Sequence, residues 1–211
     1  MNDSAKIRLS AFEMELVKNT DWIFTKQLII NKVYLLFGDL HNDFRDIISQ
    51  KKNLFISRWQ HKTGKISKGE NYKGLPYLIL DFPAVFAKED IFAIRTLFWW
   101  GNFFSISLHV SGKFYRHMKK SEEVFSVLKE NHFSVCINEN QWQHDFNVDN
   151  FKNINNLSKR EMNKIFLKPF FKTAKKIELT EWNKAEFLLI ENFKKLIDFI
   201  ALSFPGDGKA L

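Results

Sequence analysis

The sequence predicts an α+β fold, with a central antiparallel sheet of four or more strands packed by N-terminal and C-terminal helices. Apolar residues recur at helical spacing in the first fifty residues and again after residue 158. Between these segments lie short runs rich in β-branched and aromatic residues, two of which flank Gly101-Asn102. Strands grouped between helices are typical of α+β domains.

Length and composition predict a single domain over residues 1–211, with N-terminal helices in 4–50, a β-rich core in 53–146 and C-terminal helices in 158–204. A chain of 211 residues buries a sizeable core without disulfides. Cys136 is the single cysteine, so a cysteine-based zinc site is excluded. No apolar run reaches the roughly 18 residues that span a bilayer, and the polar start is not a secretory signal. We expect no membrane insertion and a cytoplasmic location.

The N-terminal segment predicts helices over 4–19, 22–37 and about 40–49. Thr20-Asp21 is a suitable cap for the second helix, and Gly38 is well placed to end it. Apolar residues cover more than one face of that helix, which indicates burial on several sides.

The central segment predicts a Lys- and Gly-rich loop over 51–74 and then several strands. Residues 77–80 are expected to form a buried strand, and residues 91–110 a hairpin closed by a two-residue turn at Gly101-Asn102. Residues 133–137 and 141–146 are expected to form a further pair. The Asn-rich stretch 147–156 then connects the core to the last helices.

The C-terminal segment begins with a capping box at Ser158 and Glu161. A helix is expected to continue toward residue 176, with Pro169 either kinking it or beginning a second helix. A final long helix is expected from about residue 180 to Phe204, where Pro-Gly stops it.

Motifs with strong chemical meaning are missing from the sequence. It has no phosphate-binding glycine loop, no nucleophile elbow and no zinc-protease motif. The six histidines lack metal-ligand spacing, and the polar run 39–43 is typical of helix capping. We therefore expect no metal and no cofactor, and whether the chain is an enzyme stays open.

The hairpin supplies the first candidate ligand site, formed by Arg95, His109 and Trp100. With a two-residue turn, Arg95 lies across from Leu108 on an apolar face and His109 lies across from Ile94. A guanidinium there needs an acceptor, because an unpaired buried charge costs several kcal/mol. The acceptor is either an anionic ligand or a structural carboxylate such as that of Asp81.

The stretch 69–77 supplies the second candidate, because loops fixed to rigid sheets commonly carry sites. Glu70 is the candidate acid or base there, with Tyr72 and Lys73 positioning a ligand. The alternative is an ordinary β-turn in which the glycines permit positive φ.

The net charge of +8 suggests a polyanionic partner, although only 6 of the 32 basic residues are arginine. Basic residues cluster at helical spacing on what we call the basic stripe: Arg160, Lys164, Lys168, Lys172, Lys175 and Lys176. The stripe lacks interleaved aromatics, so it would bind an acidic protein or a nucleic-acid backbone without reading sequence. The alternative is a solvated face in a lysine-rich chain.

These patterns leave the function open. The first hypothesis is a non-catalytic binding domain that uses the basic stripe for an anionic partner. Its alternative is an enzyme or small-anion-binding protein with a pocket near the 91–110 hairpin and the 69–77 loop. A third hypothesis is a homodimer formed through the aromatic tip of the hairpin, around Gly101.

Overall fold

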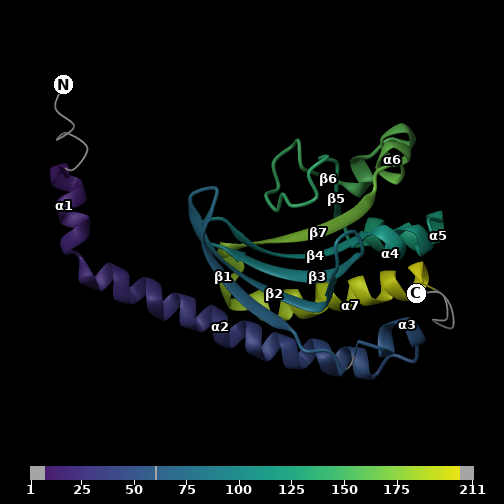
Figure 1. Cartoon of the computed structure of the whole chain (residues 1–211), viewed down its shortest axis with the longest axis horizontal. Coiled ribbons are helices and arrows are strands. Elements are labelled where there is room, and N and C mark those ends of the chain that lie inside the picture. Colours follow the sequence, from purple (N-terminus) through teal and green to yellow (C-terminus); the bar gives the residue numbers. More distant parts are fainter. Residues whose placement is uncertain (1–7, 60, 205–211) are drawn as a thin grey trace.

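The computed structural model describes residues 8–59 and 61–204, which form a seven-stranded antiparallel sheet with most of its helices packed on one face (Figure 1). The predicted α+β class and central antiparallel sheet are confirmed. The strand order is β1-β2-β3-β4-β7-β5-β6, so the last strand in sequence pairs with the middle of the sheet.

The N-terminal part forms α1 (Ala11–Lys18), α2 (Thr20–Ser49) and the short α3 (Leu54–Ser57). Asn19 caps α2 by accepting the backbone N–H of Trp22 at 3.0 Å, in place of the expected Thr20-Asp21. Helix α2 also continues through Gly38, where a stop was expected. A side chain added at Gly38 would meet no atom within 4 Å, so this part of the helix is open on that side.

Four strands follow as successive hairpins: β1 (Lys65–Tyr72), β2 (Leu75–Phe86), β3 (Ile91–Trp99) and β4 (Phe103–Ser111). Strand β1 occupies much of the stretch expected as a loop. Only Lys73 and Gly74 form the turn between β1 and β2, with φ of 50° and 82°. The candidate stretch 69–77 is therefore a tight hairpin, as its alternative interpretation stated.

The second half of the chain departs further from expectation. It forms α4 (Gly112–His117), α5 (Glu122–Glu130), β5 (Ser134–Cys136), β6 (Phe151–Asn153), η2 (Ile154–Asn156), α6 (Lys159–Phe166), β7 (Phe170–Glu178), η3 (Leu179–Lys184) and α7 (Ala185–Ser203). The capping box at Ser158 and Glu161 is present. The helix behind it ends at Phe166, so the expected helix toward residue 176 is wrong and β7 takes its place. The expected strand over 141–146 is wrong too, because these residues form a turn followed by irregular backbone.

The main core lies between the sheet and the helices. Helices α2 and α7 contribute Phe44 and Phe193, whose rings stack with centroids 3.8 Å apart. The sheet contributes alternate residues such as Ile94, Ile106 and Phe171, all buried. Among the described residues, none of the helices combines the length and apolar character needed to cross a membrane.

Candidate functional site

The turn between β3 and β4 has three residues instead of the expected two, because Trp99 pairs with Phe103. Asn102 donates its backbone N–H to the Trp99 carbonyl at 3.0 Å. Gly101 is the third residue of this β-turn and takes a φ of 69°, a positive value that is typical of type II turns and suits glycine.

The longer turn shifts the register of the hairpin by one residue. Arg95 lies opposite Ser107, and the expected pairings of Arg95 with Leu108 and of His109 with Ile94 are wrong. Because side chains alternate across a strand, Arg95, Ser107 and His109 share one face. This is the face opposite the helices, and residues 137–150 fold over it, so we call it the loop-covered face.

Arg95 forms the structural ion pair that the sequence offered as the alternative to ligand binding. Its Nε lies 2.7 Å from Oδ1 of Asp81, and its second terminal nitrogen lies 2.9 Å from Oδ2. Such two-point pairing is the strongest form of an arginine–carboxylate contact. The remaining terminal nitrogen lies 3.1 Å from Nε2 of His144. The guanidinium is thus committed within the chain.

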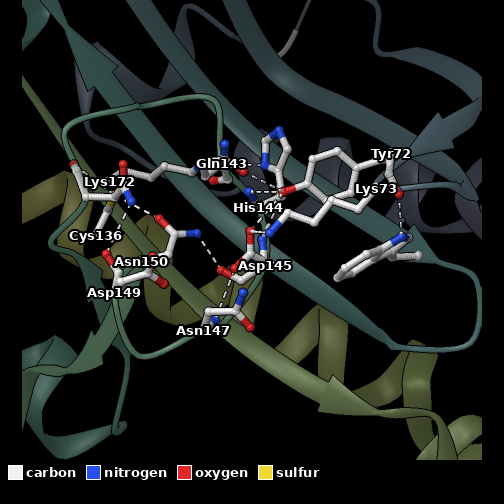
Figure 2. Close-up of polar contacts among 12 residues, drawn as sticks. Tyr72, Lys73, Cys136, Gln143, His144, Asp145, Asn147, Asp149, Asn150 and Lys172 are labelled. Carbon is white, nitrogen blue, oxygen red and sulfur yellow. Dashed lines mark hydrogen bonds and ion pairs between the residues drawn. The ribbon is translucent and has the colours of Figure 1, made fainter.

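Lys172 holds the covering loop from beneath (Figure 2). Its side chain is 2% exposed and its Nζ donates to the carbonyls of Gln143 at 2.6 Å and Gln141 at 2.9 Å. Nδ1 of His144 lies 3.3 Å from the same nitrogen. Burial, reinforced by the nearby charge of Arg95, lowers the pKa of Lys172 to about 8.

Two more lysines fix backbone carbonyls in the same way. Lys168 donates to the Asn138 carbonyl at 2.7 Å, and Lys175 donates to the Asn131 carbonyl at 2.8 Å. Desolvation by burial lowers the pKa of Lys175 as well. These ammonium groups tie residues 131–143 to the end of α6 and to β7.

The prediction that the residues of the basic stripe share one face of a helix is therefore wrong. The members of the stripe from Lys172 onward lie on a strand, where i, i+4 spacing no longer aligns side chains. Three of the stripe's six residues donate hydrogen bonds to backbone carbonyls of the same chain: Lys168, Lys172 and Lys175. The exposed remainder is Arg160, Lys164 and Lys176.

Two histidines are buried and neutral between the sheet and residues 137–150, in what we call the polar layer, which consists of the side chains of Arg95, His109, His144 and Lys172. Nε2 of His109 is 2.8 Å from Oε1 of Gln141, and burial, reinforced by the charge of Lys172, lowers the pKa of His109 to about 3. Burial and the cations of Lys172 and Arg95 hold the pKa of His144 well below its ordinary value. Protonating either ring would place a third positive charge in this layer.

The far end of the loop is anchored by Tyr72, Lys73 and Asp145 (Figure 2). The Tyr72 hydroxyl accepts the backbone N–H groups of His144 at 2.7 Å and Asp145 at 3.2 Å. Lys73 pairs with the Asp145 carboxylate at 2.8 Å. Burial alone would raise the pKa of Asp145, but these partners bring it below its ordinary value.

Of the six residues predicted for a ligand site, four lie together and two do not. Arg95, His109, Tyr72 and Lys73 meet beneath or beside the covering loop. Glu70 is exposed and pairs with Lys26 at 3.0 Å on the side of α2. Trp100 packs edge-on against Trp22 with ring centroids 6.1 Å apart.

The aromatic tip of the hairpin is covered by its own chain. Trp99 and Phe103 are buried and pack with Tyr72 and Phe146. Trp100 is only partly exposed. The tip thus lacks the exposed aromatic surface on which the predicted homodimer depended.

A cavity of about 640 Å³, which we call the cationic cavity, opens at the end of the sheet away from that tip. Phe86 and Trp142, each 47% exposed, contribute aromatic rings to it. Gln141 connects its wall to His109. The lining residues are Phe86, Ala87, Lys88, Glu89, Ile91, Ser111, Gly112, Tyr115, Arg116, Lys120, Gln141, Trp142, Phe166, Lys168 and Pro169.

The cavity lining carries four cations and one carboxylate, that of Glu89. In the described part of the chain, Lys88, Arg116 and Lys120 form no ion pair. Lys120 lies 3.8 Å from the centre of the Tyr115 ring, and burial lowers the pKa of Lys120. Lys120 also borders a second cavity of about 290 Å³, lined in part by Lys129 and Lys159.

The hydroxyl groups around the cationic cavity are already hydrogen-bonded within the chain. Ser111 donates its hydroxyl to the Glu89 carbonyl at 2.6 Å, and Tyr115 donates to the Phe166 carbonyl at 3.1 Å. Burial raises the pKa of Tyr115 to about 12. Across residues 8–59 and 61–204, no cluster of three or more histidine, cysteine, aspartate or glutamate side chains has the arrangement of a metal site.

Sequence reasoning missed several residues of this region. The covering-loop residues Gln141, Gln143, His144 and Asp145 stood in a segment expected to be a strand. The signal that could have indicated a loop is the high share of polar residues in 141–145, interrupted only by Trp142, just before the Asn-rich connector. The four basic residues of the cavity lie in three different connections between strands: Lys88, Arg116 with Lys120, and Lys168. Nothing in their spacing along the sequence indicates that they lie close together.

Comparison with known proteins does not assign the chain to a family. No family model, no curated protein and no solved structure gives a significant match to the chain. A function can therefore be argued only from the contacts of the site.

Proposed function

We propose that the chain is a non-catalytic binding domain and that its ligand is a small organic anion with a planar ring, held in the cationic cavity. The observation that carries this proposal is the excess of cations over carboxylates in a cavity of about 640 Å³. That volume is within the usual range for small-molecule sites.

The charges favour an anion because three of the four lysine and arginine groups at the cavity have no carboxylate partner in the described chain. A bound phosphate or carboxylate would supply the missing acceptor for Arg116 and Lys120. The exposed rings of Phe86 and Trp142 favour a ligand that also has an apolar plane.

Binding is favoured over catalysis because the polar groups closest to the cavity already have partners. His109 is engaged by Gln141, and the hydroxyls of Ser111 and Tyr115 donate to backbone carbonyls. A nucleophile or general base needs a free position toward the substrate.

Calorimetric titration with three probes tests the proposal: phenyl phosphate, inorganic phosphate and benzyl alcohol. We expect phenyl phosphate to bind best, because it has both the ring and the anion, and to weaken as salt rises. Replacing Arg116 and Lys120 with glutamine should weaken it about tenfold or more, since each charged hydrogen bond contributes roughly 1.5 to 3 kcal/mol.

The matched control is Lys65→Gln, which removes an exposed lysine at the start of β1, outside the cavity lining. It should bind phenyl phosphate as the wild type does. Amide chemical shifts locate the probe, and we expect changes at Gly112, Gln141 and Trp142. Equal loss of affinity in the control, or shifts confined to other residues, would refute the proposal.

A further inference from the structure

Helix α2 has two apolar faces, and the sheet covers only one of them. Its inner face buries Val33, Phe37, Leu40, Phe44 and Ile48. On the outer face, Phe24, Leu28 and Leu35 are exposed by 60%, 62% and 71%. Helix α2 lies at the edge of the molecule, with α1 projecting beyond it (Figure 1). Large apolar side chains gathered on one surface mark an interaction site.

The outer residues have the spacing of a helix-pairing seam. Phe24, Leu28, Asn31, Leu35 and Gly38 follow one another at intervals of four and three residues. This spacing places them in one line that faces a partner helix. A single polar asparagine within such a line is a known device for fixing register and the number of helices.

We propose that the outer face of α2 binds the same face of a second copy of this chain, in antiparallel orientation, with Asn31 on the two-fold axis. A residue on the axis meets its own copy. The asparagine carboxamide both donates and accepts hydrogen bonds, so two copies satisfy each other, as two lysines or two aspartates would not.

Antiparallel pairing about Asn31 also matches large residues to small ones. Leu28 of one copy lies opposite Leu35 of the other, and Phe24 lies opposite Gly38. Gly38 has no heavy atom within 4 Å of an added Cβ, so it leaves a notch on this face that an aromatic ring can enter. The outer face of α2 is therefore complementary in shape to the same face of a second copy that runs in the opposite direction.

Charge favours the antiparallel orientation over the parallel one. The first half of α2, residues 20–34, carries Asp21, Lys26 and Lys32, and because Lys26 pairs with Glu70 of the same chain, the remaining two charges cancel. The second half, residues 35–49, carries three aspartates and one arginine, a net charge of −2. Antiparallel helices place this acidic half against the uncharged half of the partner, whereas parallel helices align the two acidic halves, which repel each other.

Sedimentation equilibrium of the full chain, from micromolar to submillimolar concentration, tests the association. We expect a concentration-dependent dimer, and Leu35→Glu should sediment as a monomer with an unchanged circular dichroism spectrum. The matched control is Leu167→Glu, at a leucine that is also exposed but lies after α6. It should remain a dimer. A wild-type monomer throughout, or dimeric Leu35→Glu, overturns the proposal.

Cysteine crosslinking with diamide tests the orientation. Asn31→Cys should crosslink with its own copy, whereas Leu28→Cys should crosslink only when mixed with Leu35→Cys. A parallel pair would instead crosslink each variant with itself, and that result overturns the proposal. The native Cys136 is buried and burial raises its pKa, so the wild type is a suitable blank.

Discussion

At the scale of single residues, the contact between His144 and Lys172 determines where protons lie in the polar layer. The Arg95 guanidinium has only donors, so Nε2 of His144 accepts from it. The neutral ring then carries its proton on Nδ1, which faces Nζ of Lys172 at 3.3 Å. An uncharged amine accepts that proton with its lone pair, while an ammonium group opposes it. The amine form of Lys172, which predominates above its pKa of about 8, therefore gains a hydrogen bond that the ammonium form lacks.

This arrangement predicts that the protein becomes more stable as pH rises past the pKa of Lys172. That pKa is about 8 in the folded chain against 10.5 ordinarily, so between these values the unfolded chain holds a proton that the folded chain has released. We expect the free energy of unfolding to rise by about 1 to 2 kcal/mol between about pH 7.5 and 9.5. Urea denaturation at each pH measures it.

Lys172→Met is the control for this assignment. The variant should lose most of the alkaline rise, the remainder coming from Lys120 and Lys175, whose pKa values burial also lowers. It should be less stable by about 1 to 3 kcal/mol because two loop carbonyls lose their donor. Cys136 and Tyr115 act in the opposite direction, because burial raises the pKa of both: Cys136 from its ordinary value of 9.0, and Tyr115 from 10.0 to about 12. An alkaline rise that is as large in Lys172→Met as in the wild type would assign it to another group.

At the scale of elements, the junction between β4 and α4 depends on Gly112. Its φ is 57°, and an added Cβ would meet Oδ1 of Asp90 at 2.2 Å and the Glu89 carbonyl at 2.6 Å. Both neighbours belong to the turn that enters β3 beside the cationic cavity. A side chain at Gly112 must therefore displace the cavity wall as well as strain the backbone.

We expect Gly112→Ala to lower the free energy of unfolding by about 2 to 4 kcal/mol, combining backbone strain with overpacking. The control is Gly74→Ala, where φ is 82° but nothing lies within 4 Å of the added Cβ. That variant should lose only about 1 to 2 kcal/mol. Urea denaturation compares the two, and equal losses would show that packing against Asp90 and Glu89 contributes nothing.

The elements also show how far sequence reasoning reached. The capping box at Ser158 and Glu161 was predicted correctly because it depends on residues three apart. Strand β7 was missed because Lys172 interrupts its apolar pattern, and only the distant carbonyls of residues 141 and 143 explain a lysine buried there.

Only part of the candidate site was predicted, because the rest again depends on contacts between residues that are distant in the sequence. Arg95 and His109 were found from their place in the hairpin, but a turn longer by one residue reversed their face relative to each other. The covering loop was missed because its stability comes from side chains far away in the sequence, such as those of Tyr72 and Lys172. Short-range patterns do not contain such contacts.

At the scale of the whole molecule, the core is concentrated on the helix-covered side of the sheet, and the N-terminal end lies outside it. Helix α1 buries none of its residues, whereas the later turns of α2 are anchored from Val33 to Ile48. The described chain therefore consists of a packed body and a helical extension that the body does not need for its stability.

A pair of phenylalanine substitutions tests this division. Phe44 is fully buried against Phe193, so Phe44→Ala should lower the free energy of unfolding by about 3 to 5 kcal/mol. Phe12 lies on α1 and is exposed, so Phe12→Ala should change it by less than about 0.5 kcal/mol. Urea denaturation in dilute solution, where self-association is weak, measures both. A loss at Phe12 comparable to that at Phe44 would mean that α1 folds back onto the body, and the outer face of α2 would then be covered within a single chain.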